Sequence, residues 1–416
     1  MWKSFVFILH FLLLFFLFFG FNLLGINTRF IATGILCFLL LVLPPCRHRF
    51  LKLLKVKASR RILTSLILYL LVVIIIPLAH ETYDFNYVDS IFKLIIFYID
   101  CLILDSLLFL FKKSKSIEML NWIFIVQSII IFIAFASPSF LMLVQKFQFE
   151  NIKEVSAQYL DYGTFRGLAL AGEQFHGLTV VYGLMAIFVM KMYVESKSVK
   201  FLFVILALFA ANMFVGRTGF VGFFLAIVYL ILEEGKKTFW IIMKAFVTCL
   251  LVVCAIYCVL PENIKLLLDD NVFRYAFQLF YNYQESGQAD SSSTNRVLEM
   301  WTEDFSFFTF LVGDGKFLNG DGSYYRHVDV GYLRQLFYGG FVFVGYSLYV
   351  VWKFIMGYFK HINFKKRHFE IILFIYLLIV HTKGLDFMYA IEPMLIVFIF
   401  YIHKFKEDFL HGKLRN

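Results

Sequence analysis

The sequence predicts an all-α polytopic membrane protein with about twelve transmembrane helices and a large, partly helical extracytoplasmic loop. The chain has 416 residues, of which 61% are hydrophobic and only 16% are charged, and its mean hydropathy is +0.78. A soluble domain does not sustain such a composition. Apolar runs of about 17 to 25 residues, the helix length that crosses about 30 Å of hydrocarbon, recur along most of the chain. These observations together exclude a soluble protein.

The apolar runs define the expected spans and divide the chain. The first run, Phe5–Leu24, is too long for the apolar core of a signal peptide and has no small-residue cleavage site after it, so we expect an uncleaved span. Helices are expected over 1–260, a large loop over 261–328, and further helices with a cytoplasmic tail over 329–416. The further predicted spans are Phe30–Leu43, Ile62–Ala79, Ile91–Phe111, Ile117–Ala136, Glu173–Met190, Phe201–Val215, Thr218–Leu232, Thr238–Leu260, Asp329–Phe354, Phe369–His381 and Met388–Tyr401.

The positions of lysine and arginine predict the orientation. Loops on the cytoplasmic side of a membrane are enriched in these residues. If both termini are cytoplasmic, most of the 39 Lys and Arg residues fall on that side, including the run Arg47–Arg61. The net charge of +10 then reflects loops that flank membrane spans, and no nucleic acid partner is expected.

Two polar segments are too long to be simple turns and are predicted to lie outside the cytoplasm. They are 137–172 and 261–328, and both contain apolar and aromatic residues that argue against disorder. In the second segment, Phe273, Phe277 and Phe280 follow helical spacing, and the stretch "RVLEMWTEDF" predicts another helix.

The cysteines and acidic residues give no indication of a metal or of a disulfide. All six cysteines fall in or beside apolar segments. Cys254 and Cys258 share a helix face but have no neighbouring histidine or carboxylate. We therefore expect no disulfide, no metal and no cofactor.

Arginines at the outer ends of predicted spans suggest an anion site. Arg217 in "VGRTG" and Arg334 in "DVGYLRQLFYGG" each lie near the start of a span, where a cation opposes the positive end of the helix dipole. A bound anion would offset that cost, and the arginine fork suits phosphate oxygens. The alternative is an arginine that reaches the lipid headgroups or pairs with a carboxylate. The full set of candidates is Arg166, Arg217, Arg296, Arg326 and Arg334.

Asp329 and His327 are the candidates for proton transfer. Asp329 lies at the expected water–membrane boundary near Arg334, and a carboxylate there can accept a proton from a sugar hydroxyl. His327 can do the same, with an ordinary pKa nearer neutrality. The alternative for Asp329 is an N-cap of its span, and for His327 an isolated loop histidine. Asp100 and Asp105, inside a predicted span, either form a proton path or bond to neighbouring helices.

The order of these motifs resembles the Wzy-type O-antigen and capsular polysaccharide polymerases and the related O-antigen ligases. The resemblance rests on "RGLALAGEQF", "GRTGFVGFFLAIVYLIL", "NRVLEMWTEDFSFFTFLVGDG" and "DVGYLRQLFYGG", which together cover roughly 166–350. Each motif alone is weak, but their order and predicted sidedness agree with that family.

The resemblance implies a metal-independent glycosyltransferase of the inner (cytoplasmic) membrane that contributes to lipopolysaccharide biosynthesis. Its substrates would be undecaprenyl-pyrophosphate-linked oligosaccharides, with membrane lipids and a chain-length regulator protein as further partners. The arginines would hold the pyrophosphate, Asp329 or His327 would activate the acceptor hydroxyl, and loop aromatics would face the sugars. Those aromatics are Tyr281, Tyr283, Trp301, Tyr324 and Tyr325.

Two alternatives remain at this point. An O-antigen ligase, which transfers glycan to a lipid core, usually has a histidine followed by a small polar residue where this chain reads "HVDVGYL", so a polymerase is favoured. A flippase or transporter of lipid-linked sugars would be supported by Asp100 and Asp105, but it predicts polar residues spread through many spans. Here the charges gather in outer loops and at helix ends.

Overall fold

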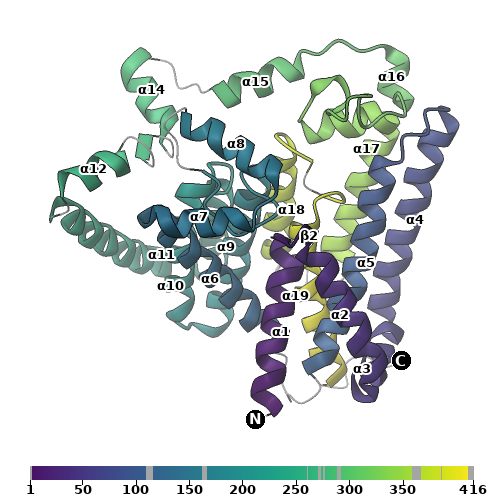
Figure 1. The fold of residues 1–416 in the computed structure, drawn as a ribbon, viewed down its shortest axis with the longest axis horizontal. Coiled ribbons are helices and arrows are strands. Elements are labelled where there is room, and N and C mark those ends of the chain that lie inside the picture. Colours follow the sequence, from purple (N-terminus) through teal and green to yellow (C-terminus); the bar gives the residue numbers. More distant parts are fainter. Residues whose placement is uncertain are drawn as a thin grey trace. The chain divides into compact units, whose positions relative to one another are not determined.

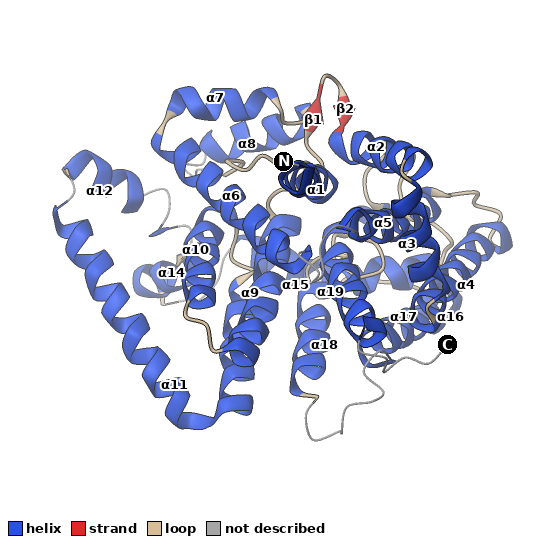
Figure 2. Cartoon of the chain, turned by 90° about the horizontal axis from the view of Figure 1, so that it is seen from below, coloured by secondary structure: helices blue, strands red, loops and turns tan. Residues whose placement is uncertain are grey.

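The computed structural model describes residues 2–108, 116–161, 166–259, 261–269, 273–274, 277–287, 292–357, 367–385 and 387–410. These residues are predominantly helical (Figure 1), which confirms the all-α class. The exception is a hairpin of two short strands, β1 (Asn22–Leu23) and β2 (Ile26–Asn27), coloured red in Figure 2. Leu24 and Gly25 both have positive φ, as the tight turns of two-residue hairpins require.

The chain forms two compact units. Unit 1 consists of Met1–Ile123, Arg296–Ile362 and Leu377–Asn416, and unit 2 consists of Phe124–Asn295 and Asn363–Tyr376. The predicted site residues are divided between them. Arg296, Arg326, His327, Asp329 and Arg334 belong to unit 1, and Arg166 and Arg217 belong to unit 2.

Unit 1 is built around one central helix. This helix, α5, is buried along most of its length, because its apolar residues contact neighbours on several sides. Its contacts are with α1, α2, α3, α4 and α19. The helices that lie wholly or mostly in unit 1 are α1 (Trp2–Phe19), α2 (Thr28–Val42), α3 (Pro44–Lys55), α4 (Lys57–Ala79), α5 (Asn86–Leu107), α15 (Ser292–Trp301), α16 (Phe307–Val312), the 3₁₀ turn η3 (Tyr325–His327), α17 (Gly331–Gly357) and α19 (Ile391–Leu410).

Helix α17 is interrupted near its start, and α16 packs at the interruption. Gly339 and Gly340 have non-helical backbone angles, and φ is +71° at Gly340, a value that favours glycine. A Cβ atom on Gly340 would collide with the backbone of Leu311 in α16. The N–H of Asp314 donates to the carbonyl of Phe337 (2.6 Å), and the N–H of Gly315 donates to the carbonyl of Tyr338 (3.1 Å). The turn at 313–315 therefore satisfies helix carbonyls just before the break.

The interior of unit 1 contains bonded polar groups. Arg29 is 6% exposed and forms a buried ion pair with Glu392. The Arg29 guanidinium also donates to the carbonyls of Leu17 (3.2 Å) and Phe18 (3.0 Å) in the last turn of α1. A cation at this end of a helix is stabilised by the helix dipole. Asp100 accepts a bond from Thr33 (2.5 Å).

Unit 2 has a tightly packed helix pair at its centre. Helices α9 and α11 approach closely where Gly183 faces Gly219 and Gly222, and a Cβ at any of these positions would collide with the opposing backbone. The φ of +76° at Gly235 breaks α11. The unit comprises all or most of α6 (Ser116–Ala136), α7 (Pro138–Lys146), α8 (Glu150–Asp161), α9 (His176–Ser196), α10 (Lys200–Val215), α11 (Phe220–Val259), α12 (Glu262–Leu268), α14 (Gln278–Ser286) and α18 (His368–His381).

Several helices are long and apolar enough to cross a membrane. Among the described residues there are four: Lys57–Ala79, Ser116–Ala136, His176–Ser196 and Gly331–Met356. A fifth results if α2 and α3, which meet at a bend of 105°, count as one span. Shorter apolar helices overlap other expected spans, among them Lys200–Val215. The larger total of about twelve stays a prediction.

The structure adds helices that hydropathy did not indicate. Helix α3 covers part of the basic run Arg47–Arg61 and begins at two consecutive prolines, which suit the first turn of a helix. The polar segment 137–172 contains α7 and α8. In 261–328 the described residues form α12, α14, α15 and α16. Of these, α15 covers "RVLEMW", the first part of the helix predicted there from the sequence. Part of the expected helix at 273–280 lies outside the described residues.

Candidate functional site

The start of α17 is held tightly against the loop that follows α18. A Cβ on Gly331 would collide with the carbonyl of Gly384 and with the His381 ring, so this position requires glycine. The Tyr332 hydroxyl donates to the carbonyl of Leu378 (3.0 Å), and the rings of Tyr332 and His381 meet edge to face at 4.6 Å. The first turn of α17, which carries Arg334, therefore has a fixed position.

Arg334 lies in a cage of aromatic rings. Its guanidinium carbon is 3.8 Å from the ring centre of Tyr324, 4.2 Å from that of Phe317 and 5.5 Å from that of Tyr389. Arg334 is 5% exposed, yet among the described residues its Nε and Nη2 atoms have no hydrogen-bond partner. Cation–π contacts recover part of the desolvation cost of the charge. Buried N–H groups without acceptors each cost about 1–3 kcal/mol, so an anion that accepted these bonds would be bound favourably.

The loop between α4 and α5 holds Phe317, one wall of this cage, in place. The Asp84 carboxylate, between α4 and α5, accepts from the backbone N–H groups of Phe317 (2.7 Å) and Leu318 (2.9 Å). Burial raises the pKa of Asp84, but these backbone bonds and those from Asn86 outweigh it and hold the pKa below its ordinary value. The ring of Tyr87 stacks on Phe317 at 4.9 Å.

A hydroxyl network supports the cage from inside unit 1. The Tyr87 hydroxyl accepts from the side chain of Gln335 (3.2 Å) and lies 3.0 Å from the hydroxyl of Tyr69. Tyr69 in turn lies 2.8 Å from the hydroxyl of Ser347. Because Gln335 follows Arg334 directly, this network ties the backbone beside Arg334 to the ring stacked on Phe317.

Asp329 lies just before α17 and does not cap it. The N–H of Arg334 donates to the carbonyl of Val330 (2.9 Å), which makes Val330 the N-cap residue. The Asp329 side chain is half-buried, and no hydrogen bond to its carboxylate is found in the part of the chain that the structure describes. The backbone N–H of Asp329 meets the sulfur of Met300 at 3.3 Å. The carboxylate thus has its lone pairs available beside the start of α17.

Arg296 occupies the same end of unit 1 through Met300. Met300 belongs to a buried cluster with Val328 and Val330, which fixes α15 against the start of α17. Arg296 is exposed and lies four residues before Met300, so the two share a face of α15. This arrangement places Arg296 one helical turn from the residue that touches Asp329.

Arg326 and His327 lie in the short turn before α17, and each makes contacts within the segment 304–327. Both have positive φ. The Arg326 guanidinium bonds to the Asp314 carboxylate (3.2 Å) and to the carbonyl of Asp304 (2.9 Å). His327 is exposed, and its Nδ1 atom lies 3.4 Å from the Ser323 hydroxyl. Arg326 is therefore already partly neutralised, whereas His327 is open to solvent.

In unit 2, Arg166 contacts the end of α10, two residues before Arg217. Arg166 donates to the carbonyl of Val215, the last residue of α10 (3.2 Å), and Arg217 donates to Gln278 at the start of α14 (2.9 Å). The turn between α10 and α11 is held by Thr179, whose hydroxyl bonds to Asn212 (2.7 Å) and to the Gly216 carbonyl (2.8 Å). The glycines of "VGRTG" allow this tight turn, which presents Arg217 at the end of the helices.

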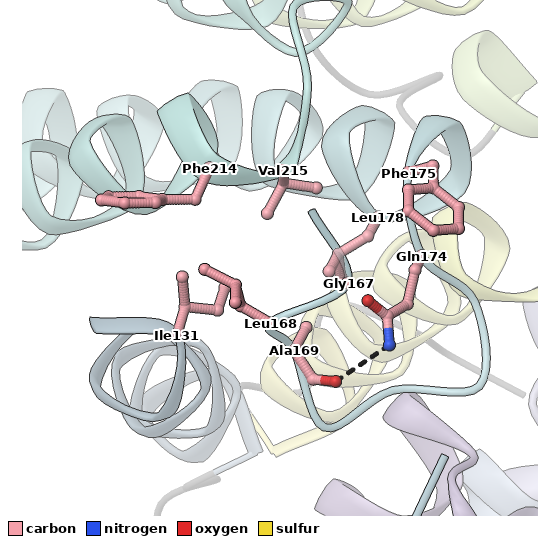
Figure 3. Close-up of a pocket in the computed structure, with 9 residues that line it drawn as sticks. All are labelled: Ile131, Gly167, Leu168, Ala169, Gln174, Phe175, Leu178, Phe214 and Val215. Atoms are coloured by element: carbon pink, nitrogen blue, oxygen red, sulfur yellow. Dashed lines mark hydrogen bonds between the residues drawn. The ribbon is translucent and has the colours of Figure 1, made fainter. Parts of the chain in front are cut away.

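A small cavity in unit 2 lies beside Arg166, and Figure 3 shows its lining. Leu168, Ile131 and Phe214 make it largely apolar, and the Gln174 amide donates to the Ala169 carbonyl at one edge (2.9 Å). Its volume suits about one water molecule. The cavity cannot hold a sugar or a pyrophosphate, so it is not a substrate site.

Sequence reasoning missed the residues that build the cage. Phe317, Tyr389 and Tyr87 lie far apart in the chain, and none stands in a motif. The ring of Tyr324, for which a contact with a sugar stays a prediction, lies against Arg334. The available signal was the run of aromatic residues around 317–325, which indicates aromatic contacts without indicating their partner.

No protein-family model, no curated protein and no solved structure matches this chain. The site geometry and the resemblance of the motifs therefore carry the functional argument.

Proposed function

We propose that this protein is a polysaccharide polymerase of the inner membrane that joins undecaprenyl-pyrophosphate-linked oligosaccharides on the extracytoplasmic side. The observation that carries the proposal is Arg334, a buried guanidinium whose Nε and Nη2 atoms have no hydrogen-bond partner among the described residues. It lies five residues after Asp329, whose carboxylate has no hydrogen bond within the same described part of the chain. An acidic phosphate group and a sugar hydroxyl are the partners that suit these two side chains.

In the proposed reaction, the acceptor hydroxyl attacks the anomeric carbon of the growing glycan. The new C–O bond forms as the bond from that carbon to the pyrophosphate oxygen breaks, and Asp329 takes the hydroxyl proton. The departing undecaprenyl pyrophosphate carries the electron pair of the broken bond. Arg334 donates to its oxygens, and a donor fixed in place before reaction stabilises the charge as it develops. Arg296 is exposed at the same end and is proposed to hold the second phosphate or the incoming lipid-linked unit.

Roles for the remaining residues follow from their contacts. Arg326 pairs with Asp314, which makes it a weaker candidate for pyrophosphate than Arg334. His327 is the second candidate for the base because it is exposed near Asp329. Arg166, which contacts the end of α10, and Arg217, which lies between α10 and α11, are proposed to bind the pyrophosphate of a lipid-linked unit. The proposed topology has about twelve spans and both termini in the cytoplasm.

The flippase alternative loses its support from the spans. Asp100 accepts from Thr33 (2.5 Å), and Asp105 accepts from Ser116 (3.0 Å) and faces Arg49 (3.5 Å). Both carboxylates therefore have partners of the kind that stabilise helix packing. The ligase alternative shares the chemistry at Asp329 and differs only in the acceptor.

The test uses the polysaccharide profile of a deletion strain complemented with variants. Asp329→Asn keeps the shape and removes the proton acceptor, so we expect turnover to fall by about 10²–10⁴-fold and single repeat units to replace polymer. Asp321→Asn is the matched control, because that exposed carboxylate bonds locally to Ser323. Normal polymer from Asp329→Asn together with none from His327→Ala would move the base to His327. Normal polymer from both would contradict the proposal, and a deletion strain with no glycan on its lipid core would indicate a ligase.

A further inference from the structure

Helix α3 presents a basic surface at the end of unit 1 where α1 begins. Figure 1 shows α3 at this end and the start of α17 at the opposite end of unit 1. Figure 2 looks at the unit from the α3 end, where α3 lies in view beside α5. The surface is therefore separate from the site at the start of α17.

One side of α3 is fixed to unit 1. Cys46 and Leu53 are buried, and the Cys46 thiol approaches the Ile103 carbonyl of α5. Arg49 reaches the same helix, with its guanidinium 3.5 Å from the Asp105 carboxylate. These contacts orient α3 and determine which of its residues face outward.

The outward side carries positive charge. Arg47, Leu51 and Lys55 repeat at a spacing of four, and His48 and Lys52 form a parallel row. All five are exposed. Leu51, which is 47% exposed, is the apolar residue within these basic rows. The sequence from 44 to 79 contains no Asp or Glu.

The next helix places this surface at a particular depth. In α4, the exposed residues are basic in the first turns and apolar farther along, where Leu68 is 53% exposed and Ile75 is 60% exposed. Exposed apolar residues on a membrane helix face hydrocarbon, whereas exposed cations face headgroups and water. The boundary therefore passes just beyond Arg61, and α3, which meets α2 at 105°, lies on the headgroup side of it.

We propose that α3 and the first turn of α4 form a binding surface for anionic phospholipid headgroups. The exposed cations that form it are Arg47, Lys52, Lys55, Lys57, Arg60 and Arg61. Phosphate oxygens of an acidic lipid accept bonds from these side chains, and Leu51 contacts the upper part of the acyl chains. The occupant is the lipid surface rather than a soluble ion, because the exposed cations are spread from Arg47 to Arg61 along α3 and the start of α4.

The experiment measures lipid preference of the full-length protein in neutral detergent. Native mass spectrometry follows titration with phosphatidylglycerol and, separately, phosphatidylcholine. We expect the wild type to bind phosphatidylglycerol more tightly. The variant Arg47→Gln/Lys52→Gln/Lys55→Gln should weaken phosphatidylglycerol binding on the order of 100-fold, since each cation near an anionic surface contributes about fivefold.

The matched control is Lys146→Gln/Lys153→Gln/Lys265→Gln, which removes the same charge from unit 2 and should leave the preference unchanged. Equal losses in the two variants, or no loss in the first, would overturn the proposal. Displacement of the lipid by excess inorganic phosphate would assign the surface to a free anion. If the wild type bound the two lipids equally, the lipid proposal would also be overturned. The surface would then be assigned to an acidic protein partner.

Discussion

Unit 1 contains two buried arginines with opposite surroundings. Arg29 is 6% exposed and Arg334 is 5% exposed. Arg29 bonds to Glu392 and to carbonyls at the end of α1, whereas Arg334 has aromatic rings around it and, in the described part of the chain, no acceptor for Nε or Nη2. The same fold therefore supplies acceptors where an arginine holds helices together. At Arg334 it surrounds the guanidinium with aromatic rings and, within the described residues, supplies no acceptor for Nε and Nη2.

The largest difference is expected in stability. Arg29→Met leaves the Glu392 carboxylate buried without its partner, so the free energy of unfolding should fall by about 3–5 kcal/mol. Arg334→Met removes a cation whose Nε and Nη2 have no acceptor among the described residues, and it places a thioether among aromatic rings, so the change should stay within about 1 kcal/mol. Thermal unfolding of the two variants in detergent measures this. Similar losses from both would remove the distinction between the two arginines.

A second prediction separates Arg334 from Arg326 by activity. Arg334→Lys keeps the charge but loses the planar fork that lies among the rings and that we propose bonds two phosphate oxygens of the substrate. Polymer formation should fall by about 10–100-fold, the range expected when a charged hydrogen bond to substrate is lost.

Arg326→Lys is the control for that prediction. Lysine at 326 can still pair with Asp314, and a partly exposed ion pair contributes about 0–1 kcal/mol, so the loss should be at most about fivefold. Polymer yield and protein level are measured together in the complemented strain. A larger effect at 326 than at 334 would assign the pyrophosphate to Arg326.

The smallest effect concerns the loop that fixes the cage. Because the folded-state pKa of Asp84 lies below its unfolded value, its contribution to stability is fully present above the unfolded pKa, near 4, and is lost as pH falls through the folded pKa. The wild type should therefore lose more stability than Asp84→Asn between neutral pH and acid. Melting temperatures measured across that range for both proteins test this, and parallel curves would show that Asp84 carries no such linkage.

The sequence predicted the helical class, and it singled out Arg334 and Asp329 as candidate site residues, for physical reasons that do not depend on tertiary contacts. Apolar runs predict helices in a membrane because backbone groups must bond within the segment. The arginine near the start of a span was visible as a cation opposed to the helix dipole. These arguments identified Arg334 and Asp329, which the structure brings to the same end of unit 1.

The rest of the site depended on contacts between distant segments. The cage joins Phe317 from a loop, Arg334 from α17 and Tyr389 from the segment before α19. An N-cap role for Asp329 was a sound alternative from sequence, and only the bond from Arg334 to Val330 moves the cap by one residue. Hydropathy also gave no sign that the basic run after Pro44 begins as a helix, since its apolar residues are too few to form a span.

The break in α17 affects when the arginine cage can assemble during synthesis. The turn at 313–315 leaves the ribosome before Phe337 and Tyr338, whose carbonyls its N–H groups must meet. Until those later residues arrive, α16 lacks the backbone that Gly340 allows it to touch, and the loop carrying Phe317 has one anchor fewer. Assembly of the arginine cage is thus postponed until α17 has been synthesised, and a chain arrested before that helix would have the wall at Phe317 but neither Arg334 nor the later wall at Tyr389.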